Sequence, residues 1–432
     1  MGLMTKGGRF LIKGLAGKRV LEGTLNVRGA KNAAPKAAAA ALLFSDTLHI
    51  TNTPDIEDFH RLLELLLKIG VRVKKTGSDS FSLLAKGKIK TSLPRALAKR
   101  MRMSVILTGP LLARFGRVSL PHPGGCLIGA RPIDLFLDGF KKMGAVVKMK
   151  EEGYELSAPR EGLHGAEIFF PTISVTGTET LMMAAVLARG TTILRNAALE
   201  PEIPALAKFL NTCGADIRGA GTSTITIKGG KLLVSKGKPY VTPPDRIEAG
   251  SFLILAALLA RDVTIASCEP SHLESLITLL TRAGVHIDVG KHSVRVRGDH
   301  KLPYHSFGLK THEYPGFPTD LQAPMAVFLT QALGEALVFE TIFESRLRYV
   351  DELVRMGADI MLLDPHRLLV RGPRPLRGKE LESPDLRAGL AYIIAALVAE
   401  GNSIIHNVYI IDRGYERIEE RLKGVGADIR RA

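Results

Sequence analysis

The sequence predicts an α/β protein of two domains, each built from three repeats of about 70 residues. Three observations lead to this prediction. A short phrase recurs along the chain, several helices are apolar on every side, and the last repeat is incomplete while the N-terminus carries strands without a helix. At 432 residues the chain is also too long for one ordinary core.

The recurring phrase is an amphipathic helix that ends in glycine, followed by Ala or Val and a strand-like alternation. The glycines recur about every 70 residues, at Gly70, Gly144, Gly214, Gly284, Gly357 and Gly426. Glycine suits the position just after a helix, because a left-handed backbone conformation ends the helix there. We therefore expect six units, each with an amphipathic helix that stops at one of these glycines.

An earlier helix in the units has a different character. The segments 33–43, 180–188, 252–260 and 390–399 are almost wholly apolar, and strands are expected soon after them at 47–52, 191–196, 262–267 and 402–407. A helix without a polar face is buried on all sides, so the sheets must lie outside these helices. Each unit is expected to run strand, buried helix, strand, amphipathic helix and hairpin, such as the hairpin at 146–158.

The two ends of the chain predict how the domains are closed. Few residues follow Gly426, whereas the segment from Phe10 reads as strands without a helix. We expect that segment to complete the sixth unit, which gives one domain of residues 1–30 plus 246–432 and another of 31–245. The crossings then fall near Gly29 and near Pro243 to Arg246, and two crossings make a double hinge suited to closure on a ligand.

Composition excludes several classes of protein. The chain has neither an apolar run long enough to span a membrane nor a secretory h-region, so a cytoplasmic protein is expected. Cys126, Cys213 and Cys268 are an odd number without metal spacing, which predicts neither a disulfide framework nor a zinc site.

The net charge of +16 has two interpretations. It is either a basic surface or a site for small phosphorylated substrates, and the scattered Lys and Arg do not decide between them. A basic RNA-binding repeat protein is the rival from another class. Because the repeats close on themselves and aromatic interleaving is absent, we expect no nucleic-acid partner. We expect a monomer.

A glycine-rich loop at 121–132 carries a thiol. Gly124, Gly125 and Gly129 surround Cys126, and Arg131 follows five residues later. A nearby cation favours the thiolate, whereas a structural cysteine needs no such loop. The loop by itself leaves a reactive and an incidental thiol equally open.

The repeat pattern, the GAKNAA opening and the GGCxIGARPxDL loop resemble the UDP-N-acetylglucosamine enolpyruvyl transferases of the EPSP synthase superfamily. FPTDLQA at Phe317 and IDRGYERIE at Ile411 extend the resemblance, which runs from about Leu21 to Arg430. It implies an EPSP synthase-like α/β fold of two inside-out, barrel-like domains, each of three βαβαββ units, with the active site between them.

The resemblance also implies a reaction. The enolpyruvyl group of phosphoenolpyruvate moves to the 3-hydroxyl of UDP-N-acetylglucosamine and phosphate is released, in the first committed step of peptidoglycan synthesis. The route is addition and elimination through a tetrahedral ketal, without a metal or organic cofactor. Such chemistry needs an acid, a base and cations for phosphate and carboxylate.

Several residues receive roles from this resemblance. Cys126 matches the proton donor, which can also form an adduct with phosphoenolpyruvate and is alkylated by the epoxide antibiotic fosfomycin. Asp320, after Pro-Thr, reads from the residues alone as a helix cap, but the resemblance makes it the base for the sugar hydroxyl. Lys31 and Arg413 complete the catalytic set. The matches for phosphoenolpyruvate binding are Lys31, Asn32, Arg131 and Arg413.

The implied nucleotide-sugar contacts are Arg102, Arg131, Pro132, Ile133, Asp134, Leu135, Ser174, Val175, Asp320 and Ile342, with Arg346, Arg387 and Glu200 as further residues of the cleft. The turn Ser174-Val175-Thr176-Gly177-Thr178 departs from a common Ser-Val-Gly-Ala-Thr form, and Thr172 stands where some members carry Lys. The sister transferase acting on shikimate 3-phosphate lacks the Cys loop and the Arg-Pro-x-Asp-Leu segment. A relative acting on another nucleotide sugar stays open.

Overall fold

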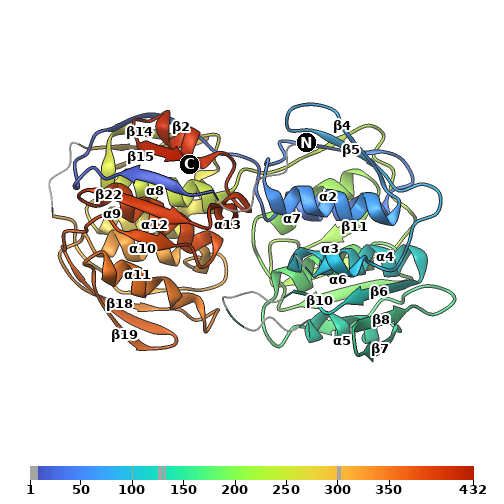
Figure 1. The fold of residues 1–432 in the computed structure, drawn as a ribbon. Coiled ribbons are helices and arrows are strands. Elements are labelled where there is room, and N and C mark those ends of the chain that lie inside the picture. The colour runs from blue at the N-terminus through green and yellow to red at the C-terminus, as the bar shows by residue number, and fades with distance from the viewer. Residues whose placement is uncertain (1–7, 100, 125–128, 130–132, 299–302) are drawn as a thin grey trace. The chain divides into compact units, whose positions relative to one another are not determined.

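The computed structural model describes residues 8–99, 101–124, 129, 133–298 and 303–432 (Figure 1). The chain forms two compact units. Unit 1 contains the chain up to Arg28 and from Pro244 onward, and unit 2 contains most of the chain from Gly29 to Pro243.

The third repeat of unit 2 shows the βαβαββ order in full. It runs β9 (Glu167–Phe169), α6 (Val175–Ala185), β10 (Thr191–Arg195), α7 (Glu202–Thr212), β11 (Asp216–Arg218) and β12 (Thr224–Lys228). Strand β9 pairs parallel with β10, and β12 pairs antiparallel with both β10 and β11, in the order β11-β12-β10-β9. The two parallel strands are joined through α6, as parallel pairing requires a crossover.

The other elements of unit 2 repeat this order. They are α1 (Ala34–Ala40), the 3₁₀ helix η1 (Ala41–Leu43), β3 (Leu48–Thr51), α2 (Glu57–Ile69), β4 (Arg72–Lys75), β5 (Phe81–Leu84), α3 (Arg95–Ala98), η2 (Arg102–Leu107), α4 (Thr108–Phe115), β6 (Arg117–Pro121), α5 (Asp134–Lys142), β7 (Val146–Lys150), β8 (Gly153–Ser157) and β13 (Pro239–Val241). Their sheets have the orders β13-β3-β5-β4 and β6-β8-β7. The hairpin expected at 146–158 is confirmed as β7 and β8.

Unit 1 is built in the same way. Its elements are β1 (Phe10–Lys13), β2 (Leu21–Asn26), α8 (Arg246–Leu259), β14 (Ala260–Ala266), η3 (Pro270–Leu273), α9 (Glu274–Arg282), β15 (Ile287–Val289), β16 (Ser293–Arg297), β17 (Leu309–Lys310), η4 (Thr319–Leu321), α10 (Gln322–Leu329), β18 (Gly334–Phe339), η5 (Arg346–Tyr349), α11 (Val350–Arg355), β19 (Asp359–Asp364), β20 (Arg367–Gly372), β21 (Glu380–Glu382), α12 (Leu386–Val398), β22 (Asn402–His406), α13 (Val408–Asp412), α14 (Ile418–Lys423) and β23 (Asp428–Arg431). Its sheets have the orders β15-β16-β14-β2, β17-β18-β20-β19 and β21-β22-β1-β23.

The apolar helices lie inside, as their composition predicts. Helices α8, α10 and α12 pack on one another in unit 1, where Figure 1 shows them between strands β14 and β18. Helix α4 packs on α6 in unit 2; α6, α8, α10 and α12 are almost wholly buried, whereas the last turn of α4 is half-buried. Glycine permits the close approach of α4 to α6, because a Cβ on Gly109 would lie 2.3 Å from the carbonyl oxygen of Thr180. The inside-out arrangement is therefore confirmed.

The six repeated glycines all adopt the left-handed conformation that the sequence predicts. Their φ angles are 107° at Gly70, 89° at Gly144, 109° at Gly214, 100° at Gly284, 103° at Gly357 and 97° at Gly426. An L side chain is strained at such φ values. The repeat of about 70 residues in the sequence therefore corresponds to the positions where the amphipathic helices end.

The N-terminal strands divide between two sheets, whereas the sequence predicted that they complete the sixth unit together. Strand β1 pairs with β22 and β23 in the sixth unit. Strand β2 instead pairs parallel with β14 and supplies the first strand of the fourth unit. Strand β13 has the matching place beside β3 in the first unit. At each crossing, the last strand before the crossing is thus the first strand of a repeat whose other elements lie elsewhere in the sequence. Strand β2 belongs to the repeat of β14, and β13 belongs to the repeat of β3.

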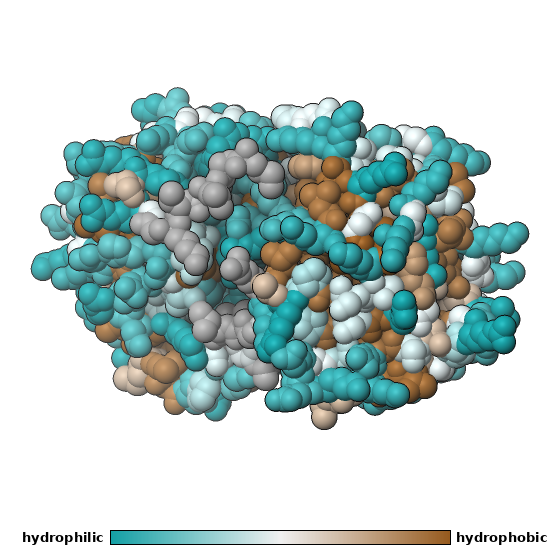
Figure 2. All heavy atoms as spheres, turned by 45° about the vertical axis from the view of Figure 1, so that its right-hand side comes forward, coloured by the Kyte–Doolittle hydropathy of each residue, from teal (hydrophilic) through white to brown (hydrophobic). Residues whose placement is uncertain are grey.

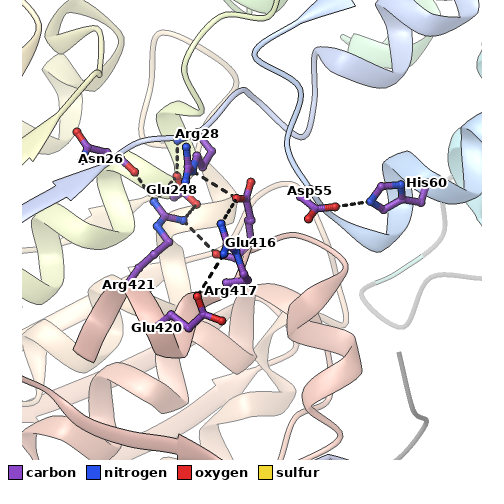
Figure 3. Close-up of polar contacts among 9 residues, drawn as sticks. All are labelled: Asn26, Arg28, Asp55, His60, Glu248, Glu416, Arg417, Glu420 and Arg421. Carbon is purple, nitrogen blue, oxygen red and sulfur yellow. Dashed lines mark hydrogen bonds and ion pairs between the residues drawn. The ribbon is translucent and has the colours of Figure 1, made fainter. Parts of the chain in front are cut away.

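A buried carboxylate anchors the end of β2, directly before the first passage (Figure 3). The Glu248 side chain on α8 accepts from the backbone N–H of Arg28 at 2.8 Å and from both terminal nitrogens of Arg421, at 2.6 and 3.0 Å. Arg421 also donates to the carbonyl of Asn26 at 2.6 Å. Because Glu248 is 3% exposed, these donors offset the cost of burying its charge.

Hydrophilic side chains cover most of the face shown in Figure 2, and apolar residues appear there as separate patches. Many basic residues of the described ranges form exposed ion pairs, such as Arg295 with Asp262 and Arg371 with Glu335. Within those ranges, no helix combines the length and the apolar character that crossing a membrane requires.

Candidate functional site

In unit 1, one carboxylate lies between two buried guanidinium groups. Asp320, in η4 at the entrance to α10, accepts a hydrogen bond from Arg346 Nη2 at 2.7 Å through Oδ1. Its other oxygen, Oδ2, lies 3.0 Å from Arg387 Nη2. The two arginine side chains are 3% and 5% exposed, whereas that of Asp320 is 25% exposed. The motif resemblance places all three residues in one site, and the structure brings them together.

Asp320 is not a helix cap, although its position after Pro-Thr favours one. The 3₁₀ turn begins after Pro318 without a side-chain cap, and the Asp320 carboxylate points to the arginines instead. Burial raises the pKa of Asp320, but Arg387 and Arg346 outweigh burial and hold it well below the usual range, with Arg246 adding to their effect. The carboxylate is therefore ionised and strongly held.

The arginines are themselves fixed by neighbouring elements. Arg387 is the second residue of α12 and donates from Nη1 to the hydroxyl of Tyr415 at 2.9 Å. Its guanidinium also lies over the Tyr415 ring, with Cζ 5.5 Å from the centroid. Arg346 Nη1 is buried and has no hydrogen-bond partner among the described residues. One donor of this pair thus remains available to an anion.

Glu340 is a residue that the sequence analysis missed. It is fully buried after β18, where Oε2 accepts from the hydroxyl of Thr319 at 2.8 Å. Oε1 accepts from the backbone N–H of Ile342 at 2.9 Å. Glu340 therefore connects the turn that carries Asp320 to the backbone of Ile342, a predicted nucleotide-sugar contact. A Glu at a strand end gives no local signal of such a role.

In unit 2, Lys31 and Asn32 lie in the turn that leads into α1. Lys31 Nζ lies 3.0 Å from Asp58 Oδ2 at the start of α2, and both side chains are mostly buried. Lys36, one turn further along, donates to the carbonyl oxygen of Asn32 and lies 3.0 Å from Glu179 Oε2. Neither Asp58 nor Lys36 was predicted from the sequence.

Ser174 is the N-cap of α6 and Val175 is the first residue of that helix. The Ser174 hydroxyl accepts from the N–H of Gly177 at 3.1 Å and caps the helix. Glu179 follows one turn later and is fully buried. Burial raises the pKa of Glu179 to about 7, Lys36 opposes this change, and the charges of Glu202 and Glu200 add to it. Glu200 thus lies beside this buried group.

The remaining predicted residues are placed as follows. Arg102 begins η2, Ile133 is buried before α5, Asp134 and Leu135 are the first residues of α5, and Arg413 follows α13. Cys126, Arg131 and Pro132 lie outside the described residues. The other two cysteines are buried thiols whose pKa values burial raises, that of Cys268 to about 11. In the described ranges, no three His, Cys, Asp or Glu side chains gather as a metal site requires.

Comparison with known proteins gives consistent results. Residues 15–422 match the profile of the family described as EPSP synthase (3-phosphoshikimate 1-carboxyvinyltransferase). Proteins named UDP-N-acetylglucosamine 1-carboxyvinyltransferase are similar to the chain. That of Solibacter usitatus is 46% identical over 95% of this chain and 97% of its own length, and that of Acidobacterium capsulatum is 47% identical over 98% and 96%.

Solved structures also share the fold. The enolpyruvyl transferase NikO from Streptomyces tendae superposes with a TM-score of 0.87 at 26% identity and covers 99% of both chains. An EPSP synthase from Acinetobacter baumannii gives a TM-score of 0.72 at 19% identity, over 98% of this chain and 100% of its own. The expectation of an EPSP synthase-like fold is thereby confirmed.

Proposed function

This chain belongs to the EPSP synthase family, and we propose that it transfers the enolpyruvyl group of phosphoenolpyruvate to the 3-hydroxyl of UDP-N-acetylglucosamine. The observation that carries this proposal is the similarity, over nearly the whole chain, to relatives named UDP-N-acetylglucosamine 1-carboxyvinyltransferase. The chain is thus a transferase of peptidoglycan synthesis. We propose that it acts as a monomer in the cytoplasm and is a target of fosfomycin.

The proposed reaction is an addition followed by an elimination. In the addition, the 3-oxygen of the sugar bonds to C2 of phosphoenolpyruvate, Asp320 takes the hydroxyl proton, and the Cys126 thiol protonates C3. In the elimination, the Cys126 thiolate left by the addition takes a proton from C3, and the bond from C2 to the phosphate oxygen breaks, which releases phosphate and leaves the enolpyruvyl ether. Lys31, Asn32, Arg131 and Arg413 hold the anionic substrate.

The arginine pair limits the basicity of Asp320 until a substrate engages the two arginines. A carboxylate that two cations hold far below its usual pKa is a weak proton acceptor. An anionic substrate that engages Arg346 and Arg387 would weaken their hold and raise the pKa of Asp320 towards a useful value. The buried Nη1 of Arg346, which has no hydrogen-bond partner within the described part of the chain, supports such an engagement.

The nucleotide-sugar side of the proposal comprises Arg102, the segment 131–135, the turn at Ser174 and Val175, and Ile342. Two of these places have a fixed backbone, which supports the proposal. The Ser174 side chain caps α6, and the backbone N–H of Ile342 donates to Glu340. Glu200 belongs to the proposal as a neighbouring carboxylate.

The test is phosphate release from phosphoenolpyruvate with and without UDP-N-acetylglucosamine, while mass spectrometry follows the sugar. Release that depends on the sugar, with an enolpyruvyl gain in mass, is the expected result. Shikimate 3-phosphate is the matched control acceptor, and transfer to it alone would contradict the proposal. Covalent phosphoenolpyruvate on Cys126 without transfer to this sugar would keep the chemistry but reject the acceptor.

A further inference from the structure

Lys36 is the one charged residue of α1, a helix of alanine, proline and lysine that is otherwise apolar. It is 3% exposed. A buried ammonium group is costly unless other groups compensate its charge and its N–H donors. Lys36 has two partners: Nζ donates a hydrogen bond to the carbonyl oxygen of Asn32, and it forms an ion pair with Glu179, whose Oε2 lies 3.0 Å away.

The carbonyl of Asn32 depends on Lys36 for a local reason. In a helix it would accept from the backbone N–H of residue 36, but that N–H donates to the carbonyl of Ala33 at 3.0 Å. Residue 35, the alternative for a tighter turn, is proline and has no N–H. The side chain of Lys36 supplies the donor that the backbone does not. It thereby orients the peptide group between Asn32 and Ala33.

Glu179 holds the other side of the ammonium group. Its carboxylate is fully buried on α6, near the side chains of Glu200, Glu202 and Tyr240. The pair therefore joins α1 to α6 inside unit 2. The turn at the start of α1 carries Lys31 and Asn32, whereas Ser174 and Val175 begin α6.

We propose that Lys36 is a positioning residue for enolpyruvyl transfer, whose ammonium group, held by Glu179, fixes the Asn32 carbonyl and thereby the turn that presents Lys31 and Asn32 to phosphoenolpyruvate. This inference rests on the proposed function, in which those two residues contact that substrate. Lys36 itself acts through the backbone of the turn.

The test compares steady-state kinetics of the full chain and its variants. Lys36→Met keeps a long unbranched side chain but removes the donor, so KM for phosphoenolpyruvate should rise about tenfold, the usual weight of a charge-assisted hydrogen bond. KM for UDP-N-acetylglucosamine should stay within about twofold, because the lost bond lies on the phosphoenolpyruvate side. Glu179→Gln keeps Lys36 as the donor to Asn32 and an amide oxygen in place of the carboxylate, so it should raise KM for phosphoenolpyruvate less than Lys36→Met does.

Two further variants separate positioning from loss of stability. Ser235→Ala in unit 2 removes the hydrogen bonds from the buried Ser235 hydroxyl to Asp46 and to the carbonyl of Thr47 without touching Asn32, and should change neither KM. Lys36→Met leaves the buried Glu179 carboxylate without its cation and could fold poorly for that reason. The double variant Lys36→Met/Glu179→Gln removes this carboxylate, and it should still show the raised KM for phosphoenolpyruvate.

Three results would overturn the inference. They are an unchanged KM for phosphoenolpyruvate in folded Lys36 variants, an equal rise in both KM values, or recovery of the wild-type KM in the double variant. A wild-type protein that releases no phosphate in response to the sugar would instead refute the proposed function, before any variant is compared.

Discussion

The difference in free energy of unfolding between the Glu179→Gln variant and the wild type should become more favourable to the variant as pH rises from acidic to neutral. In the folded chain, burial raises the pKa of Glu179 to about 7 from the ordinary 4.5, despite the ammonium group of Lys36. Between these two values the folded state holds a proton that the unfolded state has released. The free energy of unfolding of the wild-type protein therefore falls as pH rises through this interval.

The size of the effect follows from the two pKa values. One pKa unit corresponds to about 1.4 kcal/mol, so the wild-type protein loses about 3 kcal/mol between pH 4 and pH 8 through this group. Glutamine is nearly isosteric and does not titrate. The free energy of unfolding of the variant should therefore rise by about 3 kcal/mol relative to that of the wild type over this range. Most of this change should occur below about pH 7.

The assay is urea unfolding at several pH values, followed by circular dichroism. Pulse proteolysis with mass spectrometry assigns each transition to unit 1 or unit 2, because the units can unfold separately. Glu64→Gln, on the exposed side of α2, is the matched control in the same unit and should show no such gain. If the free energy of unfolding of Glu179→Gln instead falls relative to the wild type as pH rises, the ion pair with Lys36 outweighs burial and the reasoning is wrong.

Three further predictions concern the site and the packing. Asp320→Asn should lower turnover by about 10²–10⁴-fold, since a general base is lost, and a wild-type rate would remove Asp320 from that role. Its depressed pKa also means that Asp320 adds stability above about pH 4 and loses that contribution on acidification, so the unfolding free energies of wild type and variant should converge in acid. Cys126→Ser should bind UDP-N-acetylglucosamine in calorimetry but turn over poorly, and fosfomycin should add its mass to the wild type only; a labelled variant would place the reactive group elsewhere. Gly109→Ala should cost about 1–3 kcal/mol in urea unfolding, because its Cβ would meet the Thr180 carbonyl, and an unchanged midpoint would contradict the packing described.

The repeat was readable from the sequence because its signals are local. A glycine that ends an amphipathic helix is recognised from its immediate neighbours, and all six such glycines have the expected left-handed φ. Apolar stretches reveal inner helices for the same reason. The destination of β2 could not be predicted in this way, because a strand of six residues carries no record of which distant strand it pairs with.

The candidate site shows a similar limit. Asp320, Arg346 and Arg387 were assigned from motif resemblance and are found in contact. Glu340 and Lys36 were missed because their roles depend on partners distant in sequence or on a missing backbone donor. Asp320 itself was ambiguous until its partners were known, since a short carboxylate before a helix is usually a cap.

The place of β1 has a consequence for how the protein is made. Strand β1 ends at Lys13 and its neighbours β22 and β23 begin at Asn402 and Asp428. At ~5–20 residues per second, a ribosome needs about 20 to 80 s to synthesise the chain between β1 and β22. Unit 2, whose last strand ends at Val241, has all its strands well before then. Strand β1 therefore lacks its native partners until nearly the whole chain has been synthesised, long after the last strand of unit 2 is complete.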